Sequence, residues 1–148
     1  MSENKKIHIL FLCNANASRS QMAEGFCEKL KGDHIEAFSA GVNPAPRLSR
    51  NAVKVMSEIG IDISDNMPKN VSDLAGLKFD YVITLCNSIK NLTGIFPKGA
   101  EHIHYGIEDP SGFIGTVEET MNKFRQTRDQ IKKYIETLPE SLMEKTNG

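Results

Sequence analysis

The feature that most constrains the fold of this chain is an apolar run near its start that ends in a cysteine. Residues 7–12 are apolar except for His8, and the run has the length of a β-strand. Small, turn-tolerant residues follow Cys13, and a helical pattern begins at Ser18. Ser18 and Gln21 have the spacing of a capping box, which is typical of a helix N-terminus. The segment therefore predicts a strand, a tight loop and the start of a helix.

The predicted loop has the properties of an oxyanion-binding site. Main-chain N–H groups of a tight loop before a helix converge on one point, and the helix dipole adds partial positive charge there. Arg19 can donate two parallel hydrogen bonds to a tetrahedral oxyanion, which a lysine could not reproduce. We expect the oxyanion to be bound by the loop residues Asn14, Ala15, Asn16, Ala17, Ser18 and Arg19.

Cys13 is predicted to lie at the floor of this loop as a nucleophile. The helix N-terminus, the Arg19 guanidinium and a hydrogen bond from the Ser20 hydroxyl would all favour the charged thiolate over the neutral thiol. The thiolate is the reactive form of a cysteine. The alternative is a buried structural cysteine followed by a surface arginine.

Length and composition limit the other possibilities. A chain of 148 residues fits one domain, residues 1–148, and we expect flexible ends at 1–5 and 140–148. A net charge of −1 argues against nucleic acid and anionic membranes as partners. No apolar run reaches the ~18 residues of a membrane span, and no signal peptide is recognisable. Three cysteines without a paired framework fit a reducing compartment, so we expect a cytoplasmic protein without a bound metal.

Strands and helices alternate along the rest of the chain. Further strands are predicted at residues 35–41, 79–86 and 102–106. Helices are predicted from Ser18 to Gly32, from Ser49 to Gly60 and from Thr116 to Pro139. The second helix has an apolar stripe of Val53, Met56 and Ile59, and the third begins with a capping box of Thr116 and Glu119.

This alternation predicts an α/β fold with a four-stranded parallel sheet. The arrangement that fits best is a flavodoxin-like doubly wound sandwich of strand order 2-1-3-4. The strands that end in Cys13 and Cys86 would then be neighbours, about 4.8 Å apart. A disulfide needs Cα atoms within roughly 7 Å, so a modest loop movement could join the two sulfurs. The alternative for Cys86 is a small apolar residue at a strand end.

Two further residues need an interpretation. Asp109 precedes Pro110 in the loop after the fourth strand, on the same edge of the sheet as the Cys13 loop. Its carboxyl group could protonate a departing oxygen, although an aspartate that starts a proline turn is common. Cys27 lies on the first helix one position from the apolar stripe, and we expect a partly buried cysteine without a role in the reaction.

These residues and motifs resemble a known family, the arsenate reductases built on the low-molecular-weight protein tyrosine phosphatase fold. The matching segments are residues 11–13, 19–26, 39–41, 58–64, 82–86, 108–110 and 124–131. Thr84-Leu85-Cys86 favours the reductase branch, because the phosphatases usually lack a cysteine there. The resemblance implies that Cys13 attacks arsenate, that Arg19 holds the adduct and that Asp109 protonates the leaving oxygen. It also implies that Cys86 then attacks Cys13, which releases arsenite and leaves a Cys13–Cys86 disulfide.

The sequence departs from the family pattern in two places. Thioredoxin-coupled members carry a third cysteine seven residues beyond the second, where this chain has Thr93. An external thiol system such as thioredoxin, glutaredoxin or glutathione would then reduce the Cys13–Cys86 disulfide directly. In the loop, Ala17 replaces a more usual hydroxyl residue, although the orienting Asn16 is kept. Two alternatives stay open: a phosphatase that acts on phosphotyrosine or a small phosphomonoester, and an oxyanion-binding or redox-sensing module without turnover.

Overall fold

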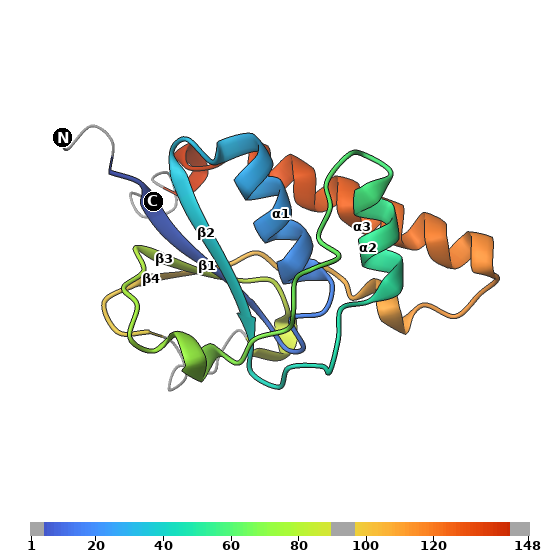
Figure 1. Ribbon diagram of the computed structural model, residues 1–148, viewed down its shortest axis with the longest axis horizontal. Coiled ribbons are helices and arrows are strands. Elements are labelled where there is room, and N and C mark those ends of the chain that lie inside the picture. The colour runs from blue at the N-terminus through green and yellow to red at the C-terminus, as the bar shows by residue number, and fades with distance from the viewer. Residues whose placement is uncertain (1–4, 90–96, 143–148) are drawn as a thin grey trace.

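The computed structural model describes residues 5–89 and 97–142. Four strands form one parallel sheet in the order β2-β1-β3-β4 (Figure 1). They are β1 (Ile7–Cys13), β2 (Ile35–Gly41), β3 (Tyr81–Thr84) and β4 (Glu101–His104). The predicted sheet and its strand order are confirmed. Strand β3 is shorter than the predicted 79–86, because Leu85 and Cys86 already leave the sheet to form the loop after it.

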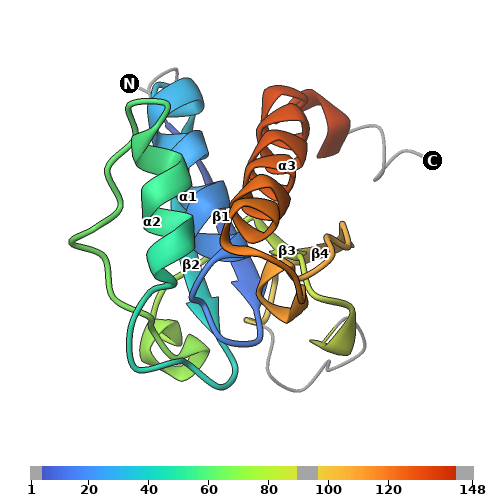
Figure 2. The same ribbon diagram turned by 90° about the vertical axis from the view of Figure 1, so that its right-hand side faces the viewer.

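The three long helices lie together on one face of the sheet (Figure 2). They are α1 (Arg19–Lys31), α2 (Arg50–Ser57) and α3 (Val117–Glu136). They bury one apolar core in which Phe11, Phe26 and Phe124 are the largest side chains. None of the helices among the described residues has the length and apolar character that a membrane span requires.

The other face of the sheet is covered by shorter elements. A second apolar cluster there joins Leu10, Leu12 and Val82 of the sheet to Val71 and Phe79. Val71 belongs to the short helix η2 (Val71–Leu74), which lies in the connection from α2 to β3. The two faces of the sheet are therefore covered unequally, one by three long helices and the other by short elements. The segment before β3 lacks the apolar periodicity that a long helix requires.

Helix α2 is rotated relative to the prediction. Its buried residues are Ala52, Val55 and Met56, whereas Ile59 is 42% exposed. The helix ends before Ile59, and Gly60 then turns the chain with a φ of 84°. Of the predicted apolar stripe, Met56 is buried and Val53 is partly buried, whereas Ile59 lies beyond the end of the helix.

Helix α3 begins as predicted. The Thr116 hydroxyl accepts the main-chain N–H of Glu119, and the Glu119 carboxylate accepts that of Thr116. After a turn at residues 137–139 the chain is helical again at residues 140–142, and Leu142 is buried in the main core. Of the end that we expected to be flexible, residues 143–148 lie outside the described part of the chain.

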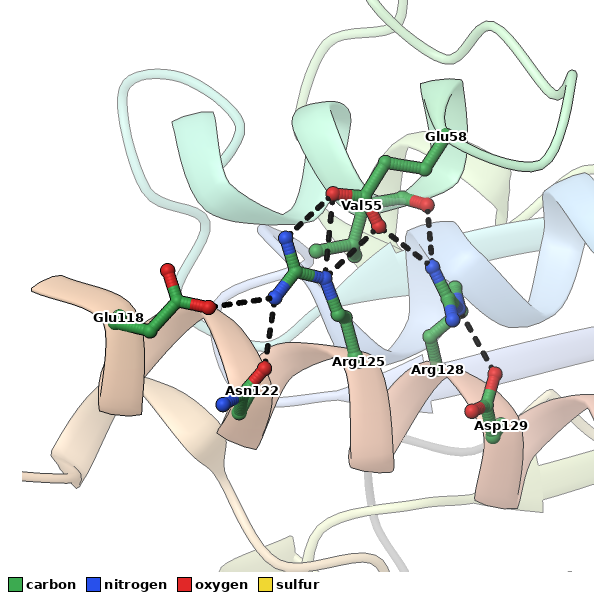
Figure 3. A network of polar contacts seen from close by, with 7 residues as sticks. All are labelled: Val55, Glu58, Glu118, Asn122, Arg125, Arg128 and Asp129. Carbon is green, nitrogen blue, oxygen red and sulfur yellow. Dashed lines mark hydrogen bonds and ion pairs between the residues drawn. The ribbon is translucent and has the colours of Figure 1, made fainter.

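A charged network ties α2 to α3 (Figure 3). The Glu58 carboxylate, just after α2, accepts hydrogen bonds from Arg125 Nε and Nη2 at 2.8–3.2 Å. Arg128 Nη1 donates to the same carboxylate and to the main-chain carbonyl of Val55, both at 3.0 Å. Helix α1, which follows the Cys13 loop, also packs against α3. The network therefore stabilises the group of helices to which α1 belongs.

Candidate active site

The loop between β1 and α1 is fixed by hydrogen bonds that its main-chain carbonyl groups accept from a neighbouring segment. Four main-chain N–H groups of the segment after β2 donate to carbonyl oxygens of the loop at 2.8–3.3 Å. The donor and acceptor pairs are Val42 and Cys13, Asn43 and Asn14, Ala45 and Ala15, and Ser49 and Ala17. Within the described residues, the N–H groups of Ala15, Ala17 and Ser18 have no acceptor. These N–H groups are therefore available as hydrogen-bond donors.

Asn16 is the centre of the loop. It is fully buried and has a φ of 53°, a left-handed conformation that asparagine tolerates better than most residues. Its main-chain N–H donates to Cys13 Sγ at 3.3 Å, and its Nδ2 donates to Ser20 Oγ at 2.8 Å. Its Oδ1 accepts hydrogen bonds from Gln21 Nε2 at 3.0 Å and from the main-chain N–H of Lys69 at 2.8 Å. Every polar group of the side chain thus fixes the loop.

The predicted capping box of Ser18 and Gln21 is wrong. The Ser18 side chain makes no capping hydrogen bond. Gln21 instead turns toward Asn16 and the carbonyl of Met67, and Asn66 Nδ2 donates to Gln21 Oε1 at 3.2 Å. The polar stretch at residues 65–69 therefore supports the loop, a role that sequence reasoning missed.

Cys13 lies beneath the loop with 2% of its surface exposed. Its Sγ is 2.9 Å from Ser20 Oγ. Because Ser20 Oγ also accepts a hydrogen bond from Asn16, its own hydrogen is free to point at the sulfur. The Cys13 sulfur therefore has two hydrogen-bond donors within reach, the Ser20 hydroxyl and the Asn16 N–H.

Arg19 is buried beside the loop and is only partly satisfied. Its Nη1 donates to the carbonyl of Ile107 at 2.9 Å, and its Nη2 lies 3.4 Å from Asp109 Oδ2. Its Nε is buried and has no hydrogen-bond partner within the described part of the chain. A buried donor without an acceptor costs about 1–3 kcal/mol. An anion bound in the loop would remove that cost.

Asp109 faces Arg19 from the loop after β4. Its Oδ1 accepts the main-chain N–H of Ser111 at 2.9 Å and the Ser111 hydroxyl at 2.7 Å, at the start of the short helix η5 (Pro110–Gly112). The side chain is 46% exposed. One carboxyl oxygen is therefore held by Ser111, while the other borders the site and can exchange a proton with solvent.

Cys86 reaches the same site from β3. Leu12 pairs with Thr84, and the Leu85 N–H donates to the Leu12 carbonyl at 2.9 Å, so the two cysteine loops leave adjacent strands. Cys13 and Cys86 belong to one apolar cluster, and neither forms a disulfide. The predicted proximity of the two loops is thus present.

The surroundings of Cys86 favour its thiolate. Burial alone would raise the pKa of Cys86, but the hydroxyl and N–H of Ser88, the positive charge of Arg19 and the N–H of Asn14 together hold it below the ordinary value. Ser88 Oγ lies 2.8 Å from the sulfur. These groups therefore increase the fraction of Cys86 that is thiolate at a given pH.

A hollow of about 410 Å³ opens between these groups. It is lined by Asn14, Ala15, Arg19, Cys86, Asn87, Ser88, Ile107, Glu108 and Asp109. The described residues contain no group of three or more His, Cys, Asp or Glu side chains that could hold a metal ion. The lining is thus suited to a small oxyanion bound by N–H groups and a guanidinium.

Cys27 lies away from this hollow. The prediction of partial burial was wrong, because its side chain is fully buried in the main core beneath α1. Burial raises the pKa of Cys27 to about 12. The thiol is therefore neutral at neutral pH and inert as a nucleophile.

Known proteins are similar to this chain in sequence and fold. An arsenate reductase of Halalkalibacterium halodurans is 43% identical over 138 residues, which cover 93% of this chain and 98% of that protein. The structure "An arsenate reductase in the phosphate binding state" is 32% identical with a TM-score of 0.77, and covers 89% of this chain and 95% of its own. "An arsenate reductase in oxidized state" is 32% identical with a TM-score of 0.75, and covers 88% and 95%. The family model described as low molecular weight phosphotyrosine protein phosphatase matches residues 8–147, and the chain belongs to this family.

Proposed function

We propose that this protein is an arsenate reductase that uses Cys13 and Cys86 in turn. The observation that carries the proposal is the presence of two reduced cysteines around one oxyanion loop. A phosphatase of this fold needs one nucleophilic thiol, whereas a reductase needs a second thiol that forms a disulfide with the first. The relatives with this fold include arsenate reductases solved in oxidised and reduced states, which supports a thiol redox cycle.

In the first step, the Cys13 thiolate attacks arsenate. The N–H groups of the loop and the Arg19 guanidinium would hold the arsenate oxygens, and Ser20 and Asn16 would stabilise the thiolate until it reacts. A bond forms between Cys13 Sγ and arsenic, and one oxygen leaves as water with a proton from Asp109. The product is a thio-arsenate adduct on Cys13.

In the second step, the Cys86 thiolate attacks Cys13 Sγ. A sulfur–sulfur bond forms, and the bond between Cys13 and arsenic breaks. Its electron pair stays on arsenic, so arsenic is reduced from the +5 to the +3 state and leaves as arsenite. The two thiols are oxidised to a Cys13–Cys86 disulfide, which balances the two electrons.

An external thiol system must then reduce the disulfide. Thioredoxin, glutaredoxin and glutathione are the candidates. A dithiol protein of the first two kinds supplies both electrons, and two glutathione molecules supply them together, through thiol–disulfide exchange. Thr93 occupies the place of the third cysteine in coupled relatives, and it lies outside the described residues. Such reductants and three free cysteines fit the cytoplasm, which we propose as the location.

The second candidate function is hydrolysis of a phosphomonoester by the same loop. The family description supports it, since phosphate could form a phosphocysteine on Cys13 that a water activated by Asp109 would hydrolyse. This reaction would not use Cys86.

The substitution Cys86→Ser separates the two functions. We expect it to abolish arsenate turnover with each reductant in turn, while hydrolysis of p-nitrophenyl phosphate continues. The matched control is Cys27→Ala, which removes a thiol outside the site and should leave both reactions intact. Arsenate turnover that is unchanged in Cys86→Ser would defeat the two-cysteine mechanism.

A further inference from the structure

We propose that His104 is a positioning residue that holds Cys86 in place through the side chain of Asn87. The inference rests on the proposed function, because the attack of Cys86 on Cys13 is the step that it concerns. His104 is outside the lining of the hollow, so it would act through Asn87 and not on the substrate.

The hydrogen bonds of His104 connect the sheet to the turn that follows Cys86. That turn is the short helix η3 (Asn87–Ile89). His104 Nε2 lies 2.7 Å from Asn87 Oδ1, and an amide oxygen only accepts, so the ring nitrogen carries the hydrogen. In a neutral ring, Nδ1 then accepts the hydroxyl hydrogen of Thr84 at 2.7 Å.

Thr84 is a rigid anchor for this connection. It is fully buried at the end of β3, and its hydroxyl oxygen also lies 3.0 Å from His102 Nε2. Since the Thr84 hydrogen goes to His104, the His102 nitrogen donates to the hydroxyl oxygen. His104 is thus oriented by a buried group on one side and meets Asn87 on the other.

The main chain at Gly106 closes the space around Asn87. A Cβ atom at Gly106 would lie 2.5 Å from Asn87 Oδ1 and 3.1 Å from His104 Nε2. No side chain fits there without moving the amide of Asn87. The Asn87 amide, although the residue is exposed, therefore lies directly against the main chain at Gly106.

The position of Asn87 determines the surroundings of Cys86. Asn87 lies between Cys86 and Ser88, and Ser88 gives the sulfur both a hydroxyl and an N–H hydrogen bond. Arg19 and the Asn14 N–H also act on the sulfur only while the turn stays beside the loop. If the turn moved away from the loop, the Cys86 sulfur would lose these contacts. Cys86 would then attack Cys13 more slowly and would need a higher pH to reach the same rate.

Two substitutions of His104 separate its contacts. His104→Gln places an amide nitrogen near the position of Nε2 and keeps the bond to Asn87, whereas His104→Asn mimics Nδ1 and loses it. In a single turnover with arsenate, quenched with acid and mapped by mass spectrometry, we expect His104→Asn to form the Cys13–Cys86 disulfide roughly three- to tenfold more slowly. We expect His104→Gln to stay within about twofold of the unmodified protein, since its bond to Asn87 remains.

A second pair of variants tests the packing. Gly106→Ala should displace Asn87 and slow disulfide formation in the same way, whereas Gly76→Ala adds a methyl group in open space and should have no effect. In both slow variants, Cys86 alkylation should reach a given rate only at a higher pH than in the unmodified protein. A general loss of stability would not produce this shift. Protection of Cys13 from alkylation by inorganic phosphate should be unchanged, because His104 bonds to Thr84 and Asn87 and is outside the lining of the hollow.

The outcomes distinguish this inference from the proposed function. If the unmodified protein forms the disulfide with arsenate but His104→Asn does so at the same rate and with the same pH dependence, the role of His104 is overturned. Loss of phosphate protection in His104→Asn would also overturn it, since His104 would then support the whole site. If the unmodified protein forms no disulfide with arsenate, the proposed function fails together with this inference.

Discussion

The two cysteine loops at the same edge of the sheet are built differently. The Cys13 loop is fixed by four main-chain hydrogen bonds from the segment after β2, and its central residue Asn16 is fully buried. The turn after Cys86 has Asn87 and Ser88 exposed to solvent. Among the described residues, its side chains are held by hydrogen bonds of the Cys86 sulfur with Ser88 and the Asn14 N–H, and of Asn87 with His104. One thiol lies in a rigid anion site, and the other lies beside it on a lightly held turn.

This difference matches the two roles that we propose. A loop that stabilises charge must keep its N–H groups in position before the substrate arrives, so rigidity favours the first step. Cys86 must exchange its hydrogen bond to Ser88 for a covalent bond to Cys13, so its turn must adjust. The comparison predicts that changes to the rigid loop affect every reaction of Cys13, whereas changes to the turn affect only disulfide formation.

The largest expected effect is that of Arg19→Lys. A lysine cannot reproduce the planar set of donors, so we expect kcat/KM to fall roughly a hundredfold or more for both arsenate reduction and p-nitrophenyl phosphate hydrolysis. Steady-state kinetics on both substrates check this. A loss confined to one substrate would show that Arg19 does not serve a common anion site.

A smaller effect is expected for Gly41→Ala. A Cβ atom at Gly41 would lie 2.6 Å from the Asn14 carbonyl oxygen and 2.9 Å from the Asn16 nitrogen, so the loop must shift. We expect the free energy of unfolding to fall by about 1–3 kcal/mol and both reactions to slow. Urea unfolding and kinetics measure these changes, with Gly76→Ala as the control. An unfolding free energy equal to that of the unmodified protein would mean that the loop is not rigid.

Ser88→Ala tests the turn alone. Loss of the Ser88 hydroxyl raises the pKa of Cys86, because that hydrogen bond helps to hold it below the ordinary value. Below the pKa the thiolate fraction falls as the pKa rises, so disulfide formation should slow by a few-fold near pH 7 and recover at alkaline pH. Single-turnover rates against pH measure this, with the exposed Ser72→Ala as control. A constant ratio of rates at every pH would contradict it.

The smallest effect is expected for Glu58→Gln, which lies outside both cysteine loops. The guanidinium groups of Arg125 and Arg128 hold the pKa of Glu58 below its usual range (Figure 3). A lowered pKa in the folded state adds stability above the unfolded pKa, and this stability is lost as the pH falls through the folded value. We expect a slightly lower Tm at neutral pH and a difference that narrows in acid. Glu136→Gln, on α3 outside the network, is the control, and a Tm difference that persists in acid would refute this.

Much of the fold and site could be predicted from local sequence. The strand, loop and helix around Cys13 follow from a short apolar run and small residues, and the alternation of strands and helices gives the sheet order. The sheet order then brings Cys13, Cys86 and Asp109 to one edge. These properties depend on neighbours in sequence or on general rules for parallel sheets.

The remainder depends on contacts between distant segments. The Gln21 side chain bonds to Asn16, Asn66 and Met67, which nothing in its own helix indicates, and so the capping box was predicted wrongly. Cys27 is fully buried because α1 packs against both the sheet and α3, which widens its buried stripe. The bond between His104 and Asn87 likewise joins the end of β4 to the turn after β3.

The most direct test of the account is to identify the disulfide formed in one turnover. Reduced protein is mixed with arsenate in the absence of any reductant, quenched with acid, alkylated and mapped by mass spectrometry, while arsenite is measured in the same sample. The account predicts one Cys13–Cys86 disulfide for each arsenite released, with Cys27 still a free thiol. Arsenite released without that disulfide, or a disulfide that includes Cys27, would contradict it.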